Sequence, residues 1–122
     1  MLTIHTIKQY TMKCPPMIGL EREHKIQEKY NTFNAVGGGK KFITDTQTIL
    51  LNQLFHFTKN DFPYYTTKNI EHWVCWYGKD ISVSEIINSI GKNCDIVTYW
   101  KNHTFNRSIA EINHIHVFIQ KS

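Results

Sequence analysis

The C-terminal stretch NHIHVFIQ, residues 113–120, constrains the fold of this chain more than any other segment. In a β-strand successive side chains point to opposite faces, so two histidines share one face and three branched apolar residues share the other. The histidines are His114 and His116, and the apolar residues are Ile115, Val117 and Ile119. An apolar strand face has to be buried, so the segment predicts a sheet with at least one covered side.

Three further segments after residue 69 have clear signals. IEHWVCWY at 70–77 is branched and aromatic, which predicts a strand, and DIVTYWKN at 95–102 predicts another. Between them, Ser82 and Glu85 have the spacing of a capping box at the start of a helix. Gly91 fits the left-handed residue that often ends a helix. The C-terminal half therefore predicts a strand, a helix and two further strands.

The N-terminal half predicts helices. Apolar residues at helical intervals among charges indicate helices over 20–33 and 42–55, separated by the glycine-rich segment 36–41. Residues 2–7 alternate loosely and predict a short strand. The resulting fold class is α+β: a small, mostly antiparallel sheet with the N-terminal helices and one inserted helix packed on one face.

Length and composition predict one cytosolic domain. A chain of 122 residues can form one core, so residues 1–122 are expected to be a single domain. No apolar run approaches the roughly 20 residues of a membrane helix, and the N-terminus lacks the features of a signal peptide. The three cysteines are odd in number and include no CxxC pair, which is typical of a reducing compartment.

The charge favours an anionic partner only weakly. The formal net charge is +4, with 14 Lys and Arg against 10 Asp and Glu, and the pI is near 9.0. The basic residues are spread along the chain, and no basic run extends beyond Lys40 and Lys41. A lysine-rich solvated surface explains this pattern without a nucleic-acid site.

The segment VGGGKK at 36–41 is not a phosphate-binding loop. That motif needs a glycine where Asn34 stands and a Ser or Thr where Lys41 stands. The signatures of serine hydrolases, zincins and EF-hands are also absent from the sequence. The glycines are therefore interpreted as a linker between two helices.

The tryptophans have two interpretations. Trp73, Trp76 and Trp100 could stack on nucleic-acid bases, or they could fill the core of a small sheet. Trp73 and Trp76 are three residues apart on one predicted strand, so they point to opposite faces. At most one of those two can belong to a given stacking platform.

The two histidines of the last strand are candidates for a functional site. Strand positions i and i+2 suit two metal ligands, or a nucleophile and its partner. His72 on the other predicted strand could add a third group, and Asn102 and Ser108 lie just across the preceding loop. No fourth ligand is evident, so no metal site is predicted. A purely structural role, with both histidines hydrogen-bonded inside the sheet, is the alternative.

Two segments resemble a known family. NDFPY…NIEHWVCWY at 60–77 and YWKN…RSIAEINHIHVFI at 99–119 are similar to the N-acetylglucosamine-induced protein 1 family. This family is also catalogued as a domain of unknown function, with relatives in fungi, other eukaryotes and large DNA viruses. The chain departs from the family pattern where His103 and Thr104 replace prolines and where Arg107 replaces a frequent Gln.

The resemblance implies a polar site drawn from both segments. It consists of Asp61, His72, Asn102, Ser108, His114 and His116. We assign catalytic roles to His114, His116 and Ser108, and ligand binding to Asp61, His72, Trp73, Asn102 and Arg107. The family name suggests a link to amino-sugar or nucleotide-sugar metabolism. No cofactor or oligomeric state is implied.

Three functions of different classes follow from these residues. The first is binding or processing of a small phosphorylated or nucleotide-linked ligand of the amino-sugar type. A sharper version is a resemblance to histidine-triad nucleotide hydrolases, although the first triad histidine is missing. The second function is RNA or mRNA-cap binding through tryptophan stacking. The third is a non-enzymatic interaction module in which the histidines are structural.

Overall fold

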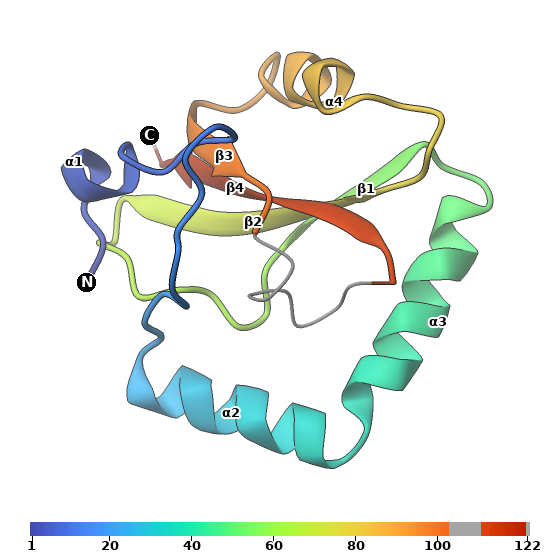
Figure 1. The fold of residues 1–122 in the computed structure, drawn as a ribbon, viewed down its shortest axis with the longest axis horizontal. Helices are drawn as coiled ribbons and strands as arrows, with labels where there is room; N and C mark the ends of the chain where they lie inside the picture. The colour runs from blue at the N-terminus through green and yellow to red at the C-terminus, as the bar shows by residue number, and fades with distance from the viewer. Residues whose placement is uncertain (103–110, 122) are drawn as a thin grey trace.

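The structure is a computed structural model and describes residues 1–102 and 111–121. Its elements follow one another as helices and then strands, with one helix inserted (Figure 1). In chain order they are α1 (Ile4–Ile7), α2 (His24–Ala35), α3 (Gly38–Leu50), β1 (Phe55–Lys59), β2 (Ile70–Tyr77), α4 (Val83–Ile90), β3 (Ile96–Trp100) and β4 (Asn113–Gln120).

The four strands form one antiparallel sheet in the order β1-β2-β4-β3. The two longest strands, β2 and β4, lie side by side in the centre, and their register pairs Val74 with His116 and His72 with Phe118. His72 and His116 are thus diagonal neighbours on one face of the sheet. The predicted α+β class is confirmed.

One face of the sheet is covered by α4. Ile86 and Ile90 of this helix pack on apolar side chains of both central strands. Those side chains are Cys75, Tyr77, Ile115, Val117 and Ile119. The alternation expected for residues 113–120 is therefore confirmed, because all three branched residues of β4 lie on this face.

The opposite face carries both histidines of β4 and is covered by other elements. Ile7 of α1 packs with Trp100 and Phe118, and α3 packs against Val74 and Trp76. Helices therefore lie on both faces, where a single covered face was expected (Figure 1). The reason is that β2 and β4 bury side chains of both faces, so each side needs its own cover.

Local geometry corrects several expected elements. Of residues 2–7, expected as a strand, Ile4–Ile7 form helix α1, because Thr3 and Thr6 make a reciprocal capping box. Leu2 forms only an isolated β-bridge with Thr66. Gly91 is right-handed, with φ −63°, so the expected left-handed stop is wrong. The Ser82–Glu85 capping box of α4 is confirmed.

The glycine-rich segment is mostly helical. Only Gly37, with φ 76°, breaks the chain, and α3 begins directly after it at Gly38. Strand β1 was not predicted, because the sequence indicates a helix over residues 42–55 that would include its first residue. Helix α2 has no buried residue. It is held through Tyr30 and Phe33, whose rings lie 5.3 and 5.1 Å from that of Phe62.

No helix in the described ranges has the length and hydropathy needed to span a membrane.

Candidate functional site

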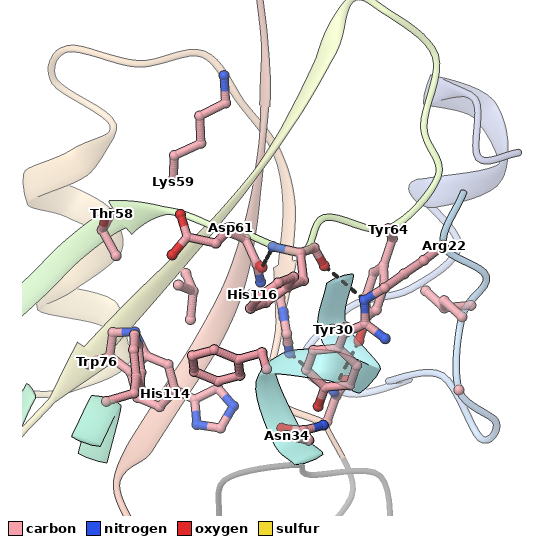
Figure 2. Close-up of a pocket in the computed structure, with 18 of the residues that line it drawn as sticks. Arg22, Tyr30, Asn34, Thr58, Lys59, Asp61, Tyr64, Trp76, His114 and His116 are labelled. Carbon is pink, nitrogen blue, oxygen red and sulfur yellow. Dashed lines mark hydrogen bonds between the residues drawn. The ribbon is translucent and has the colours of Figure 1, made fainter. Parts of the chain in front are cut away.

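A pocket of about 250 Å³ lies over the sheet face that carries the histidines. Residues of α2, of α3 and of the loop after β1 complete its walls (Figure 2). Its aromatic lining residues are Tyr30, Phe33, Phe42, Phe62, Tyr64 and Trp76, and its main polar ones are Arg22, Asn60, Asp61, Asn102, His114 and His116. Figure 2 shows Arg22, Tyr30 and Tyr64 on one side, with Trp76 and His114 on the other.

A chain of hydrogen bonds runs beneath this pocket through two buried imidazoles. The backbone N–H of Tyr64 donates to Nδ1 of His72 at 3.0 Å. Nε2 of His72 lies 2.7 Å from Nδ1 of His116. Nε2 of His116 in turn lies 3.0 Å from Nδ2 of Asn102. His72 and His116 are only 2% and 6% exposed, so the chain connects the polypeptide backbone to a residue of the pocket wall.

Asn102 has a defined amide orientation. Nε1 of Trp100 donates to its Oδ1 at 2.9 Å, so the nitrogen of the amide faces the other way. That nitrogen is 3.3 Å from the Tyr64 hydroxyl and 3.0 Å from His116. Asn102 therefore approaches His116 as a donor, like the Tyr64 amide at the far end of the chain.

This chain of hydrogen bonds, from Tyr64 to Asn102, contains one hydrogen-bond donor too many. The Tyr64 amide, the Asn102 amide and two neutral imidazoles bring four hydrogens to three contacts, but the imidazoles have only two lone pairs. One contact must therefore join two N–H groups, whichever tautomers are chosen. A buried donor without an acceptor costs on the order of 1–3 kcal/mol, so the site favours an added acceptor atom.

The imidazoles are neutral at physiological pH. Burial holds the pKa of His116 near 3, and the neighbouring His114 and Arg22 act in the same direction. Burial, followed by His116 and Arg22, keeps the pKa of His72 well below its usual range. Burial also raises the pKa of Tyr64, so its hydroxyl keeps its proton. The residues beneath the pocket are thus uncharged.

Arg22 provides a positive charge at the pocket. Its Nε donates to the Phe62 carbonyl at 2.8 Å, and its guanidinium lies 4.3 Å from the centre of the Tyr30 ring and 5.1 Å from that of Tyr64. These contacts fix the side chain and engage one of its five N–H donors. Lys59 also lines the pocket, but its ammonium pairs with Glu71 at 2.9 Å and points away (Figure 2).

His114 lies at the other side of the pocket. Its Nδ1 is 3.1 Å from the Ile112 carbonyl, which accepts, so this nitrogen carries the proton of the neutral ring and Nε2 is the basic atom. The ring lies 4.4 Å from that of Trp76. Nε1 of Trp76 is buried without a partner in the described part of the chain.

The structure brings together five of the predicted site residues. Asp61, Asn102, His114 and His116 line the pocket, and His72 is bonded to His116 directly beneath it. It does not bring Trp73 there. Trp73 lies on the opposite face, stacked on Phe57 at 4.7 Å, because three positions separate it from Trp76 on β2. Ser108 and Arg107 lie outside the described residues.

Sequence reasoning missed Arg22, Tyr30 and Tyr64. A usable signal existed for Arg22: it is one of only two arginines among the 14 basic residues, and arginine is preferred where a planar cation stacks on rings. Tyr64 is the last residue of the NDFPY segment that carries the family resemblance, so a signal existed for it as well. Tyr30 gave no signal, because only the fold brings its segment to the pocket.

The tryptophans do not form a common stacking platform. Trp100 is fully buried, Trp73 lies on the other face of the sheet, and Trp76 is 5% exposed. Core packing is their main role.

No metal centre is evident in residues 1–102 and 111–121, where no three His, Cys, Asp or Glu side chains are grouped to hold an ion.

Comparisons with known proteins give a fold likeness. No family model matches the sequence, and no curated protein is significantly similar to it. The structure is similar to the crystal structure of HTC1, with a TM-score of 0.60 and 18% sequence identity. The match covers 84% of this chain and 77% of that chain. At this identity the likeness shows a shared fold and nothing about activity.

Proposed function

We propose that this protein binds a small anionic ligand in the pocket over His116, namely a phosphorylated or nucleotide-linked sugar. The observation that carries the proposal is the surplus of donors around His116. The Tyr64 amide, the two imidazoles and the Asn102 amide nitrogen bring four hydrogens to three contacts, where only two imidazole lone pairs can accept. Phosphate oxygens are acceptors and would relieve that surplus.

The electrostatics of the pocket support the same ligand class. Arg22 is fixed against two aromatic rings beside the neutral histidines, and guanidinium groups bind phosphate and carboxylate oxygens in a bidentate manner. The hydroxyl of Tyr64 adds a further donor, because its raised pKa keeps the proton in place.

The size and walls of the pocket favour a compact ligand. About 250 Å³ is slightly below the roughly 300 Å³ at which pockets for drug-sized molecules begin, which suits a sugar phosphate or one end of a nucleotide-linked sugar. Phe42 and Trp76 offer aromatic surface to the body of such a ligand. The resemblance to the N-acetylglucosamine-induced protein 1 family favours an amino sugar, in a cytosolic protein.

Processing of the ligand belongs to the same proposal. His114 presents Nε2 as its basic nitrogen, because Nδ1 donates to the Ile112 carbonyl. A neutral histidine in this state can accept a proton from a bound ligand near pH 7. His114 is therefore the group we propose as a general base.

Calorimetric titration of the Arg22→Met variant tests the proposal. The probes are inorganic phosphate, N-acetylglucosamine phosphate and UDP-N-acetylglucosamine, with neutral N-acetylglucosamine as a fourth. Loss of a charge-assisted contact of about 1.5–3 kcal/mol predicts binding of the anionic probes that is about ten to a hundred times weaker. The control is Lys25→Met, which removes the same charge from an exposed position of α2. Equal affinities in both variants would contradict the proposal.

A further inference from the structure

We infer that the Tyr64 backbone amide and the His72 imidazole together set His116 as a neutral hydrogen-bond donor toward the ligand's anionic oxygen. His72 is then a positioning residue, because it acts on the ligand only through His116. The inference rests on the proposed function for the ligand, but the tautomer that it assigns to His116 exists in the ligand-free protein as well.

The chain of hydrogen bonds from Tyr64 through His72 and His116 is called the relay below. The Tyr64 amide decides which atom donates at each of its contacts. The amide of Tyr64 can only donate, so Nδ1 of His72 must be the unprotonated nitrogen. The proton of neutral His72 then lies on Nε2 and points at Nδ1 of His116, 2.7 Å away. His116 must accept there, which leaves its own proton on Nε2, on the side of Asn102 and the pocket.

The His72 ring is held in the orientation that this relay needs. It stacks against the ring of Tyr64, at 4.6 Å, and against the ring of Phe118, at 4.5 Å. The Asn60 amide nitrogen lies 3.5 Å from Nε2, too long to compete with the contact to His116. Rotation of the imidazole would break the Tyr64 bond and both stacking contacts, so its two nitrogens keep their roles.

The mismatched contact therefore falls at the pocket end. Both Nε2 of His116 and Nδ2 of Asn102 are donors there, 3.0 Å apart. A backbone amide cannot move out of the way, whereas the side chain of Asn102 can shift by a small rotation. An oxygen of the ligand can accept from both groups, which makes this end the place where an anion is recognised.

The relay has no lone pair left for an additional proton. Nδ1 of His72 accepts from the Tyr64 amide and Nδ1 of His116 accepts from His72, so both imidazole lone pairs are used. The titratable and charged groups that line the pocket around the pair are Arg22 before α2, Tyr30 of α2, His56 and Lys59 of β1, Tyr64 and Asp61 of the loop after β1, and His114 of β4. The exposed Asp61 is the one carboxylate among these described groups. The relay therefore binds an anion without itself taking up a proton.

Two variants of His72 separate positioning from packing. In His72→Gln, the amide oxygen can accept from Tyr64 and the amide nitrogen can donate to His116, so the direction of the relay is kept. In His72→Leu, the volume is largely kept but no group donates to His116. We expect His72→Gln to bind inorganic sulfate within about threefold of the wild type, and His72→Leu to bind it about tenfold or more weakly.

The spectroscopic test uses protein labelled with nitrogen-15 in its histidines. The wild type and His72→Gln should show His116 protonated on Nε2 and bare on Nδ1 between about pH 6 and about pH 8. His72→Leu should lose this tautomer preference. A His116 protonated on Nδ1 in the wild type would overturn the inference, whether or not any ligand binds.

Sulfate also tests the absence of proton uptake, because it stays a dianion throughout this pH range. In the sulfate-saturated wild type, the nitrogen-15 shifts of His72 and His116 should remain those of neutral imidazoles between about pH 6 and about pH 8. A His72 or His116 that carries protons on both ring nitrogens when sulfate is bound would show uptake of a proton by the relay and overturn the inference. If sulfate fails to bind and the anionic sugars do too, the proposed function fails, while the tautomer measurement still decides the relay.

Discussion

Acidification from about pH 7.5 to about pH 5.5 should destabilise this protein substantially, because His72 and His116 are buried without charge. In the unfolded chain a histidine has a pKa near 6.5. In the folded protein the pKa of His116 is about 3, and that of His72 is well below its usual range. Between these values the unfolded chain binds protons that the folded protein does not, so stability is present above about pH 6.5 and is lost as pH falls.

The magnitude follows from the number of groups and the pH interval. At about pH 5.5, one unit below the unfolded pKa, each histidine costs about 1.4 kcal/mol of unfolding free energy. For the two histidines together the loss is about 3 kcal/mol, against a total stability of roughly 5–15 kcal/mol for a domain. For a chain of 122 residues this corresponds to a decrease in Tm of about 10 °C.

The assay is urea unfolding followed by tryptophan fluorescence and circular dichroism at both pH values. His24→Gln is a matched control, because it removes an exposed histidine of α2 and leaves the buried pair in place. The double variant His72→Gln, His116→Gln should flatten it. A wild-type stability that is constant or rises on acidification would refute the reasoning, because the buried pair would then be able to hold a proton.

Three further predictions concern single sites. Ser82→Ala removes the side chain that accepts from the Glu85 amide at the start of α4, so it should cost about 1 kcal/mol in urea unfolding; a change below about 0.2 kcal/mol would contradict the capping role. Cys14 is exposed, whereas Cys75 is fully buried and burial raises the pKa of its thiol to about 12. An aromatic disulfide reagent should therefore label Cys14 at once and Cys75 only on unfolding. Rapid labelling of Cys75 in the folded protein would contradict its buried position. Asn102→Ala leaves the Trp100 N–H without its acceptor, so it should lower the free energy of unfolding by about 1–3 kcal/mol and also abolish ligand binding. His114→Ala should abolish ligand binding with a smaller loss of unfolding free energy. Equal losses of unfolding free energy in the two variants would favour a structural role for His114.

The sequence predicts the strands that carry the site better than it predicts the site itself. Period-two alternation places His114 and His116 on one face, and it also separates Trp73 from Trp76, because both patterns depend only on the geometry of one strand. The proximity of His72 to His116 could be proposed but not fixed, since it depends on the register between β2 and β4.

The remaining parts of the site depend on long-range packing. Arg22 reaches the pocket because the segment before α2 packs beside Phe62 and Tyr64, a contact across about forty residues that no local pattern encodes. The role of Tyr64 is carried partly by its backbone amide, which is invisible in the side-chain sequence. The helix at residues 4–7 was missed because its capping box uses two threonines, where a Glu or Gln is usual at the second position.

The most direct test of anion binding over His116 is a phosphate titration followed by backbone amide NMR. The account predicts shifts that saturate together at Phe62, Tyr64, Asn102 and His116, which surround Arg22 and the donor-rich end of the relay. Amides of α4, on the other face of the sheet, should not change. Saturating shifts confined to exposed lysines, or no shift at the pocket at high phosphate concentration, would contradict the central claim.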